Sequence, residues 1–141
     1  GGVFAGFFDV LFDQNLATTV GNFSYGPNFT VTQSGTASPG LLDEAGAAAG
    51  SVTPTGAGLK ELFSIQMQAT ANGDLVFTTE EAEESPAHDN LLYDSNDVID
   101  ADRVDYGSVS LTVTPVPNAR TVPGSPRMLR SALTAGACAR T

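Results

Sequence analysis

The sequence predicts an all-β protein, an antiparallel β-sandwich, on three observations. Apolar and polar residues alternate in seven or eight short runs, which is the pattern of strands with one buried face and one wet face. Turn residues separate these runs at short intervals, since the 141 residues include 15 glycines and 8 prolines. Hydrophobic residues make up 41% of the chain, which is enough for one packed domain.

The first strand is predicted at residues 3–12, "VFAGFFDVLF", a run that is apolar on both faces apart from Asp9. Such a run is typical of a strand that is covered on both sides. Residues 13–15, "DQN", then turn the chain. By alternation, one face of this strand holds Phe4, Phe8, Val10 and Phe12, and the other holds Phe7, Asp9 and Leu11.

Shorter strands are predicted after this turn. Residues 18–33 contain two β-prone pieces that are broken at Gly26-Pro27. Residues 39–48 contain one short strand at best, and a loop of small residues follows through Gly58.

A hairpin is predicted at the centre of the chain. Residues 59–70 and 74–79 alternate apolar and polar side chains on either side of Asn72-Gly73, a dipeptide typical of two-residue hairpin turns. We therefore expect the two runs to pair as antiparallel neighbours. Propensity alone also allows a helix over residues 59–69, and the turn signal favours the strands.

The last strand is predicted at residues 108–115, after an acidic loop at 80–90 and a short strand at 91–93. Its alternation directs Val109, Leu111 and Val113 inward. Residues 116–141 contain no acid and little periodicity, which predicts a linker or disordered tail. The predicted domain therefore covers residues 1–115.

Charge and composition exclude several functions. Residues 1–119 hold all 16 acidic residues, whereas four of the six basic residues are arginines within 120–141. A segment this acidic repels the phosphate backbone of a nucleic acid, so we do not expect nucleic-acid binding. Binding of a cation or of a basic partner protein stays a possible function. No apolar run is long enough to span a membrane. The single cysteine, Cys138, cannot form an internal disulfide, and we interpret it as an incidental thiol.

The order of four segments resembles cohesin-like modules, in particular the copies found in very large secreted bacterial proteins. The segments are "VFAGFFDVLFDQNL", "SPGLLDEAGA", "LFSIQMQATANGDLVFTTEEAEESPAHDNLLY" and "VDYGSVSLTVTP", which together span about residues 3–114. In the first segment, Phe12-Asp13 matches the step with which the corresponding cohesin strand ends.

This resemblance implies a nine-stranded jelly-roll sandwich that binds dockerin modules through one sheet face and has no catalytic activity. It implies an extracellular or cell-surface location. It also implies that an opening strand precedes Val3, so the chain reads as an excised piece whose signal peptide, if any, lies outside it. A sandwich without that strand exposes a sheet edge and part of its core.

The oxygen-rich stretch at 91–107, "LLYDSNDVIDADRVDYG", is the candidate metal site. An EF-hand loop that begins at Asp94 needs a glycine where Ile99 stands, so that motif fails. Calcium held by Asp94, Asn96 and Asp97 with backbone carbonyls stays open, because hard oxygen atoms are the ligands calcium prefers. The alternative is a solvated acidic turn.

Other candidate sites have simple structural explanations. His88 beside Asp89 is expected to be a loop histidine capped by its neighbour, since no nucleophile motif accompanies it. The acidic run Glu80, Glu81, Glu83 and Glu84 is either a docking patch or a solvated loop. We expect no enzyme activity, because glycosidase chemistry needs two acids fixed across a cleft.

We therefore predict a non-catalytic protein-binding module whose partner is a dockerin-bearing protein. The alternatives are a structural spacer or adhesion domain of a bacterial surface protein and a carbohydrate-binding module. The last of these is weaker because the chain has no tryptophan and only three scattered tyrosines.

Overall fold

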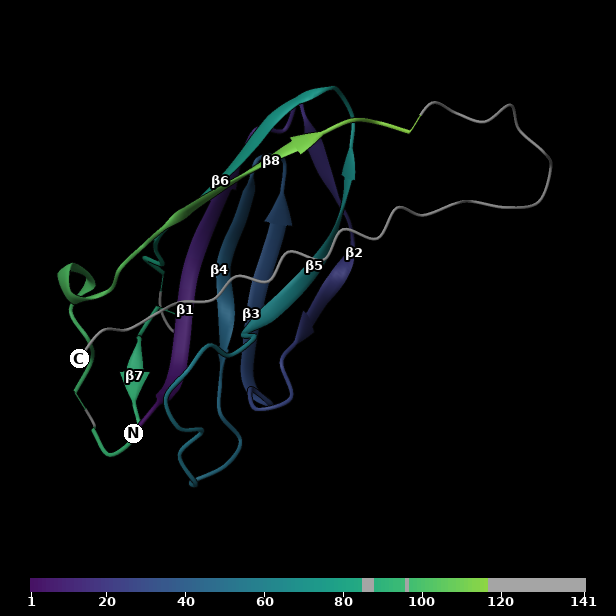
Figure 1. Ribbon diagram of the computed structural model, residues 1–141. Helices are drawn as coiled ribbons and strands as arrows, with labels where there is room; N and C mark the ends of the chain where they lie inside the picture. Colours follow the sequence, from purple (N-terminus) through teal and green to yellow (C-terminus); the bar gives the residue numbers. More distant parts are fainter. Residues whose placement is uncertain (85–87, 96, 117–141) are drawn as a thin grey trace, which may run out of the picture.

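The computed structural model describes residues 1–84, 88–95 and 97–116 (Figure 1). Apart from Val116, the predicted tail at 116–141 lies outside these residues. Within the described part, no helix has the length and apolarity needed to cross a membrane. The elements in chain order are β1 (Val3–Phe12), β2 (Ala17–Tyr25), β3 (Val31–Ser38), β4 (Leu41–Ala48), β5 (Phe63–Ala69), β6 (Gly73–Glu81), β7 (Leu91–Leu92), the 3₁₀ helix η1 (Ala101–Arg103) and β8 (Ser108–Val113).

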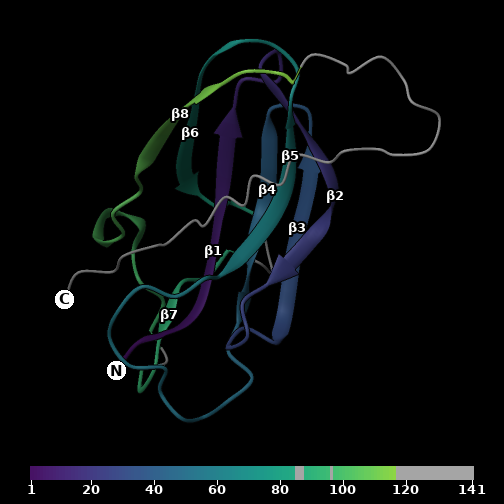
Figure 2. The ribbon, with the colours of Figure 1, turned by 45° about the vertical axis from the view of Figure 1, so that its right-hand side comes forward.

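The strands form two antiparallel sheets of unequal width, which confirms the predicted all-β class. The larger sheet has the order β3-β4-β1-β6-β8, with β7 also paired to β1, and the smaller sheet contains β2 and β5. In Figures 1 and 2 the small sheet lies over the β3–β4 side of the large sheet, and β6 and β8 lie toward the other side. The described topology does not show the jelly-roll arrangement.

The main core lies between the two sheets. Phe8 of β1 contacts Phe63 of β5 with ring centroids 5.4 Å apart, and Phe12 contacts Phe77 of β6 at 6.0 Å. We name the face of the large sheet that carries Phe8 and Phe12 the inner face, and the opposite face the outer face. Other buried members of this core include Val10, Phe29, Leu42, Leu62, Ile65, Met67 and Leu75.

Strand β1 follows the sequence prediction at both ends. It spans Val3–Phe12, and its inner-face residues Phe8, Val10 and Phe12 are buried as expected. Phe4 is the exception, because it packs with Phe7 in a smaller apolar cluster instead of joining the main core. The lower part of β1, where it pairs with β7, has an irregular register that breaks the simple alternation.

The predicted hairpin around Asn72-Gly73 is wrong, although both runs are strands and the helix alternative does not occur. β5 pairs with β2 in the small sheet, whereas β6 pairs with β1 and β8 in the large sheet. Neither Asn72 nor Gly73 has a positive φ, which a two-residue type I′ turn requires. An added Cβ at 73 would lie 2.8 Å from Leu16 Cδ2, so the Leu16 side chain would have to move to admit another residue there. The connection therefore crosses between the layers.

The inward residues of β8 differ from the prediction in their burial. Leu111 pairs with the buried Leu75, and Val109 pairs with the buried Phe77, so both lie on the inner face as expected. They are nevertheless 42% and 46% exposed. The reason is that β2 and β5 form a sheet too narrow to reach β8.

Candidate metal centre on the outer face of the six-stranded sheet

A β-bulge between β1 and β4 gathers acidic side chains on the outer face. Phe8 pairs with Ala45 and Val10 pairs with Leu42, so Asp9 lies opposite two residues, Asp43 and Glu44. Such an extra residue bends a strand and redirects its side chains.

Glu44 has a left-handed backbone at this bulge, with φ of 53°. For a residue other than glycine this conformation costs about 1 kcal/mol or more. The Asp9 carboxylate offsets part of that cost, because its Oδ1 accepts a hydrogen bond of 2.8 Å from the Glu44 backbone N–H. The strained bulge and the carboxylate therefore hold each other in place.

Three carboxylates come together as a result. One carboxylate oxygen from each of Asp9, Asp43 and Glu44 lies within 4.8 Å of the other two, and all three residues are half-buried. Glu80 of β6 pairs with Asp9 from the other side. Burial raises the pKa of Asp9, the Glu44 N–H lowers it, and the negative charges of Asp43, Glu44 and Glu80 raise it further.

The two carboxylate oxygens of Glu44 have different surroundings. Oε1 accepts hydrogen bonds from the backbone N–H groups of Glu83, at 2.9 Å, and Glu84, at 2.7 Å. Oε2 is buried and has no hydrogen-bond partner among the described residues. One oxygen therefore fixes the side chain, and the other has a hydrogen-bonding capacity that no described residue satisfies.

This arrangement has the chemistry of a hard-cation site. Calcium binds six to eight oxygen ligands at about 2.3–2.6 Å, and carboxylates are its commonest charged ligands. The Asp9–Asp43–Glu44 triad would supply three such groups, with waters completing the shell. The triad could bind a metal such as calcium, which would also relieve the repulsion between its charges.

The sequence-predicted calcium residues lie elsewhere. Asp94 has 80% of its side chain exposed, and its Oδ2 lies 3.9 Å from the amino group of Gly1. Asp97 is also exposed, and its backbone N–H donates to Ser95 Oγ. Asn96 lies outside the described residues. Calcium binding at this loop therefore stays a prediction.

Two other candidates can be placed. His88 Nδ1 lies 3.0 Å from Asp89 Oδ1, which is the neighbour contact expected from the sequence. The acidic run divides, because Glu80 and Glu81 end β6 while Glu83 and Glu84 follow it and bind Glu44. This run therefore supports the triad through its backbone as well as adding charge near it.

Sequence reasoning missed the triad for an identifiable reason. Asp9 stood out as the one acid in an apolar strand, whereas nothing in the sequence marked Asp43 and Glu44 as its neighbours. The strand register and the bulge bring these residues together, and neither can be predicted from a single sequence. An isolated acid within a buried strand was the only signal available.

Comparisons with known proteins add no family. No family model, no curated protein and no solved structure matches the chain. Fold and comparisons together therefore identify an all-β protein with two antiparallel sheets, without assigning it to a family.

Proposed function

We propose that this chain is a non-catalytic protein-binding module of the cohesin-like type, with a jelly-roll arrangement, that acts outside the cell on a partner such as a dockerin-bearing protein. The observation that carries the proposal is the uncovered inner face of β8, where Val109 and Leu111 are 46% and 42% exposed. Exposed apolar surface beside a well-packed core is typical of interaction sites. The cohesin-like order of the segments suggests the class of partner.

The charge of the chain supports a binding role. The net charge is −10, and the triad and Glu80 concentrate part of it on the outer face. A field of this sign accelerates encounters with a basic partner and disfavours like-charged ones. Calcium at the Asp9–Asp43–Glu44 triad would tie β1 to β4 and, through Glu44, to residues 83–84, which would stiffen this end of the sheet.

Carbohydrate binding has less support. Sugar-binding sandwich modules present flat aromatic side chains to solvent. Here all eight phenylalanines and three tyrosines lie within the described residues, and each is buried or half-buried. The apolar residues exposed on the strands are aliphatic.

The test is a pull-down of purified dockerin-bearing proteins on the immobilised chain, with 1 mM calcium or with EDTA. Retention that survives washing at moderate salt supports the proposal. Retention in neither condition, by a chain shown to be folded by circular dichroism, contradicts it and favours the spacer or adhesion role.

A further inference from the structure

The two edges of the large sheet differ in their protection against a further strand. β3 forms one edge, and its pairing with β4 shifts register twice, once beside Thr32, which has a positive φ of 48°. Such irregularities blunt an edge. β8 forms the other edge, and its sequence "SVSLTV" pairs with β6 without a register shift, a charge or a proline. The β8 edge is therefore regular and lacks the usual protection.

The hydrogen bonds of β8 show which of its backbone groups face this edge. The Thr79 N–H donates to the Gly107 carbonyl at 3.0 Å, and the same register continues along β8. Because hydrogen-bonded pairs alternate in an antiparallel ladder, the odd-numbered residues of β8 bond to β6. The N–H and C=O groups of the even-numbered residues point away from β6, to a side where no strand is paired within the described part of the chain. These residues are Ser108, Ser110 and Thr112, and all three are exposed.

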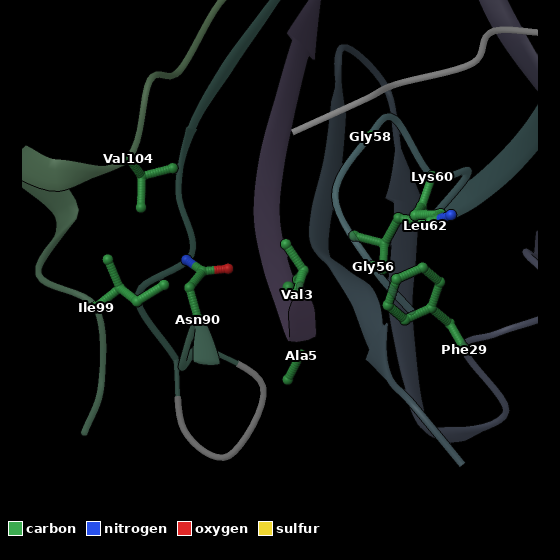
Figure 3. Close-up of a pocket in the computed structure, with 11 residues that line it drawn as sticks. Val3, Ala5, Phe29, Gly56, Gly58, Lys60, Leu62, Asn90, Ile99 and Val104 are labelled. Carbon is green, nitrogen blue, oxygen red and sulfur yellow. The ribbon is translucent and has the colours of Figure 1, made fainter. Parts of the chain in front are cut away.

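The start of β8 is held to the rest of the domain, so the edge is preorganised. The Gly107 N–H donates to Thr79 Oγ1 at 3.0 Å, in addition to the bond that its carbonyl accepts. Ahead of β8, Ile99 and Val104 line a pocket together with Asn90 (Figure 3). The pocket has a volume of about 50 Å³, which is far too small for a substrate-sized molecule. These contacts fix the direction of β8 before any partner arrives, which lowers the cost of binding.

We propose that the β8 edge accepts β8 of a second copy of this chain, antiparallel to the first and related to it by a twofold axis at Ser110. In this register Ser108 of one copy pairs with Thr112 of the other, so the outward backbone groups of both strands are satisfied. Val109 of one copy then lies opposite Leu111 of the other, in a pair with closely spaced side chains. The two copies thus cover the inner-face residues that are 46% and 42% exposed in one copy.

The charges near this edge do not oppose the contact. The acids of β6, which are Asp74, Glu80 and Glu81, lie at least three strand spacings from those of the other copy, because both β8 strands lie between them. Three spacings of about 4.8 Å make about 14 Å, which exceeds the Debye length of about 8 Å at physiological salt. At the ends of the contact the charges have opposite signs. The end of one β8 lies beside the exposed Asp105 of the other copy, and the sequence after Val116 contains four arginines and no acid.

The contact is small, and it shares a surface with the partner proposed above. Six residues per copy are fewer than the about 20–30 residues that a standard interface buries on each side. We therefore expect a weak dimer that forms at high protein concentration. The dimer does not depend on the proposed partner, but both use Val109 and Leu111, so each should exclude the other.

The experiment measures sedimentation velocity and amide hydrogen exchange of the full chain from about 10 μM to about 1 mM. We expect a shift from monomer to dimer. Exchange at Ser108, Ser110 and Thr112 should slow as the concentration rises, whereas Val109 and Leu111 should exchange slowly at every concentration because they bond to β6. A chain that stays monomeric throughout would overturn the proposal. Slow exchange of the even-numbered amides at every concentration would mean that a segment of the same chain covers the edge, and would reject the second copy.

Ser110→Pro tests the strand pairing because it removes only the outward N–H at the twofold axis. Proline is accepted in an edge strand where its missing N–H would face solvent, so the β6–β8 ladder should persist. The variant should stay folded by circular dichroism and stay monomeric at about 1 mM. The matched control Ser110→Thr keeps the N–H and should dimerise like the native chain. A folded Ser110→Pro that dimerises as well as the native chain would refute pairing at this edge.

A second pair of variants tests the assigned face without changing a backbone bond. Val109 and Val76 are both 46% exposed on neighbouring strands, but Val109 faces inward and Val76 faces outward. Val109→Lys should weaken the dimer by about tenfold or more, the loss expected when a valine-sized apolar contact is removed, and Val76→Lys should leave it nearly unchanged. Equal losses in both variants would refute the assigned face.

Sedimentation and the pull-down separate this inference from the proposed function. A chain that dimerises through β8 but retains no dockerin-bearing protein contradicts the proposed function and supports the dimer. A chain that stays monomeric at every concentration but retains such a protein overturns the dimer and leaves the binding role in place.

Discussion

Strands β1 and β8 belong to the same sheet and both direct apolar residues to its inner face, yet these residues end in opposite environments. On β1, Phe8, Val10 and Phe12 are 1–8% exposed, whereas on β8 Val109 and Leu111 are 46% and 42% exposed. The difference is not in the strands but in what covers them, because the two-stranded sheet packs over the first and not over the second. Alternation thus determines which face a side chain joins, and the width of the opposite layer determines whether it is buried.

The largest expected effect comes from truncating the covered strand. Phe8→Ala removes a ring that is 3% exposed and packed on Phe63, and should lower the free energy of unfolding by about 3–5 kcal/mol. Leu111→Ala should cost about 1 kcal/mol or less, because water already reaches that side chain. Urea denaturation measures both. Similar losses at the two positions would contradict the unequal cover.

A second prediction concerns the pairing of β1 with β4. A Cβ at Gly46 would collide with the carbonyl oxygen of Gly6 and lie 2.7 Å from Phe7 Cα, so Gly46→Ala should cost about 1–3 kcal/mol. Gly107→Ala is the control, since an added Cβ there meets nothing within 4 Å. If thermal unfolding shows equal stability for the two variants, the close approach of β1 and β4 is wrong.

The third prediction compares the two acidic regions of the molecule. If the triad binds calcium, 1 mM calcium raises the melting temperature, and Asp9→Asn abolishes the increase while Asp97→Asn leaves it intact. Asparagine keeps an oxygen for the Glu44 N–H, so the bulge is preserved. The reverse pattern would place calcium at the 94–97 loop, and a melting temperature unaffected by calcium would reject both sites.

The smallest effect is the pH dependence contributed by Asp9. Its pKa is raised above 3.8, mainly by burial, so the folded state binds this proton more tightly than the unfolded state does. The stability that this group contributes is therefore complete below pH 3.8 and decreases as the pH rises through its folded pKa. Asp9→Asn should lack this decrease. Denaturation midpoints measured in EDTA from pH 3 to 7 would contradict the assignment if both proteins followed the same curve.

Much of the fold was predictable because it depends on local pattern. The bounds of β1 follow from a continuous apolar run that ends at a turn signal. The strand character of residues 63–69 and the inward direction of Val109 and Leu111 follow from a period of two. The pairing of β5 and β6 was not predictable in the same way. Two amphipathic strands separated by a short connection look alike in sequence whether they form a hairpin or cross between layers.

The Asp9–Asp43–Glu44 triad could not be predicted from the sequence for a related reason. It depends on a bulge that places Asp9 opposite both Asp43 and Glu44. It also depends on a left-handed backbone at Glu44, a conformation that is normally signalled in a sequence by glycine or asparagine. Sequence instead favoured the densest local run of oxygen ligands, at 94–97. Sites assembled from distant strands are visible only once the register is known.

Amide hydrogen exchange along β5 of the free, full-length chain tests the central claim, that the small sheet ends at this strand. The claim predicts slow exchange at Ser64, Gln66 and Gln68, which face β2, and faster exchange at Ile65, Met67 and Ala69, whose N–H groups point away from β2. Equally slow exchange at odd and even positions would mean that another strand already occupies that edge, and the account would fail.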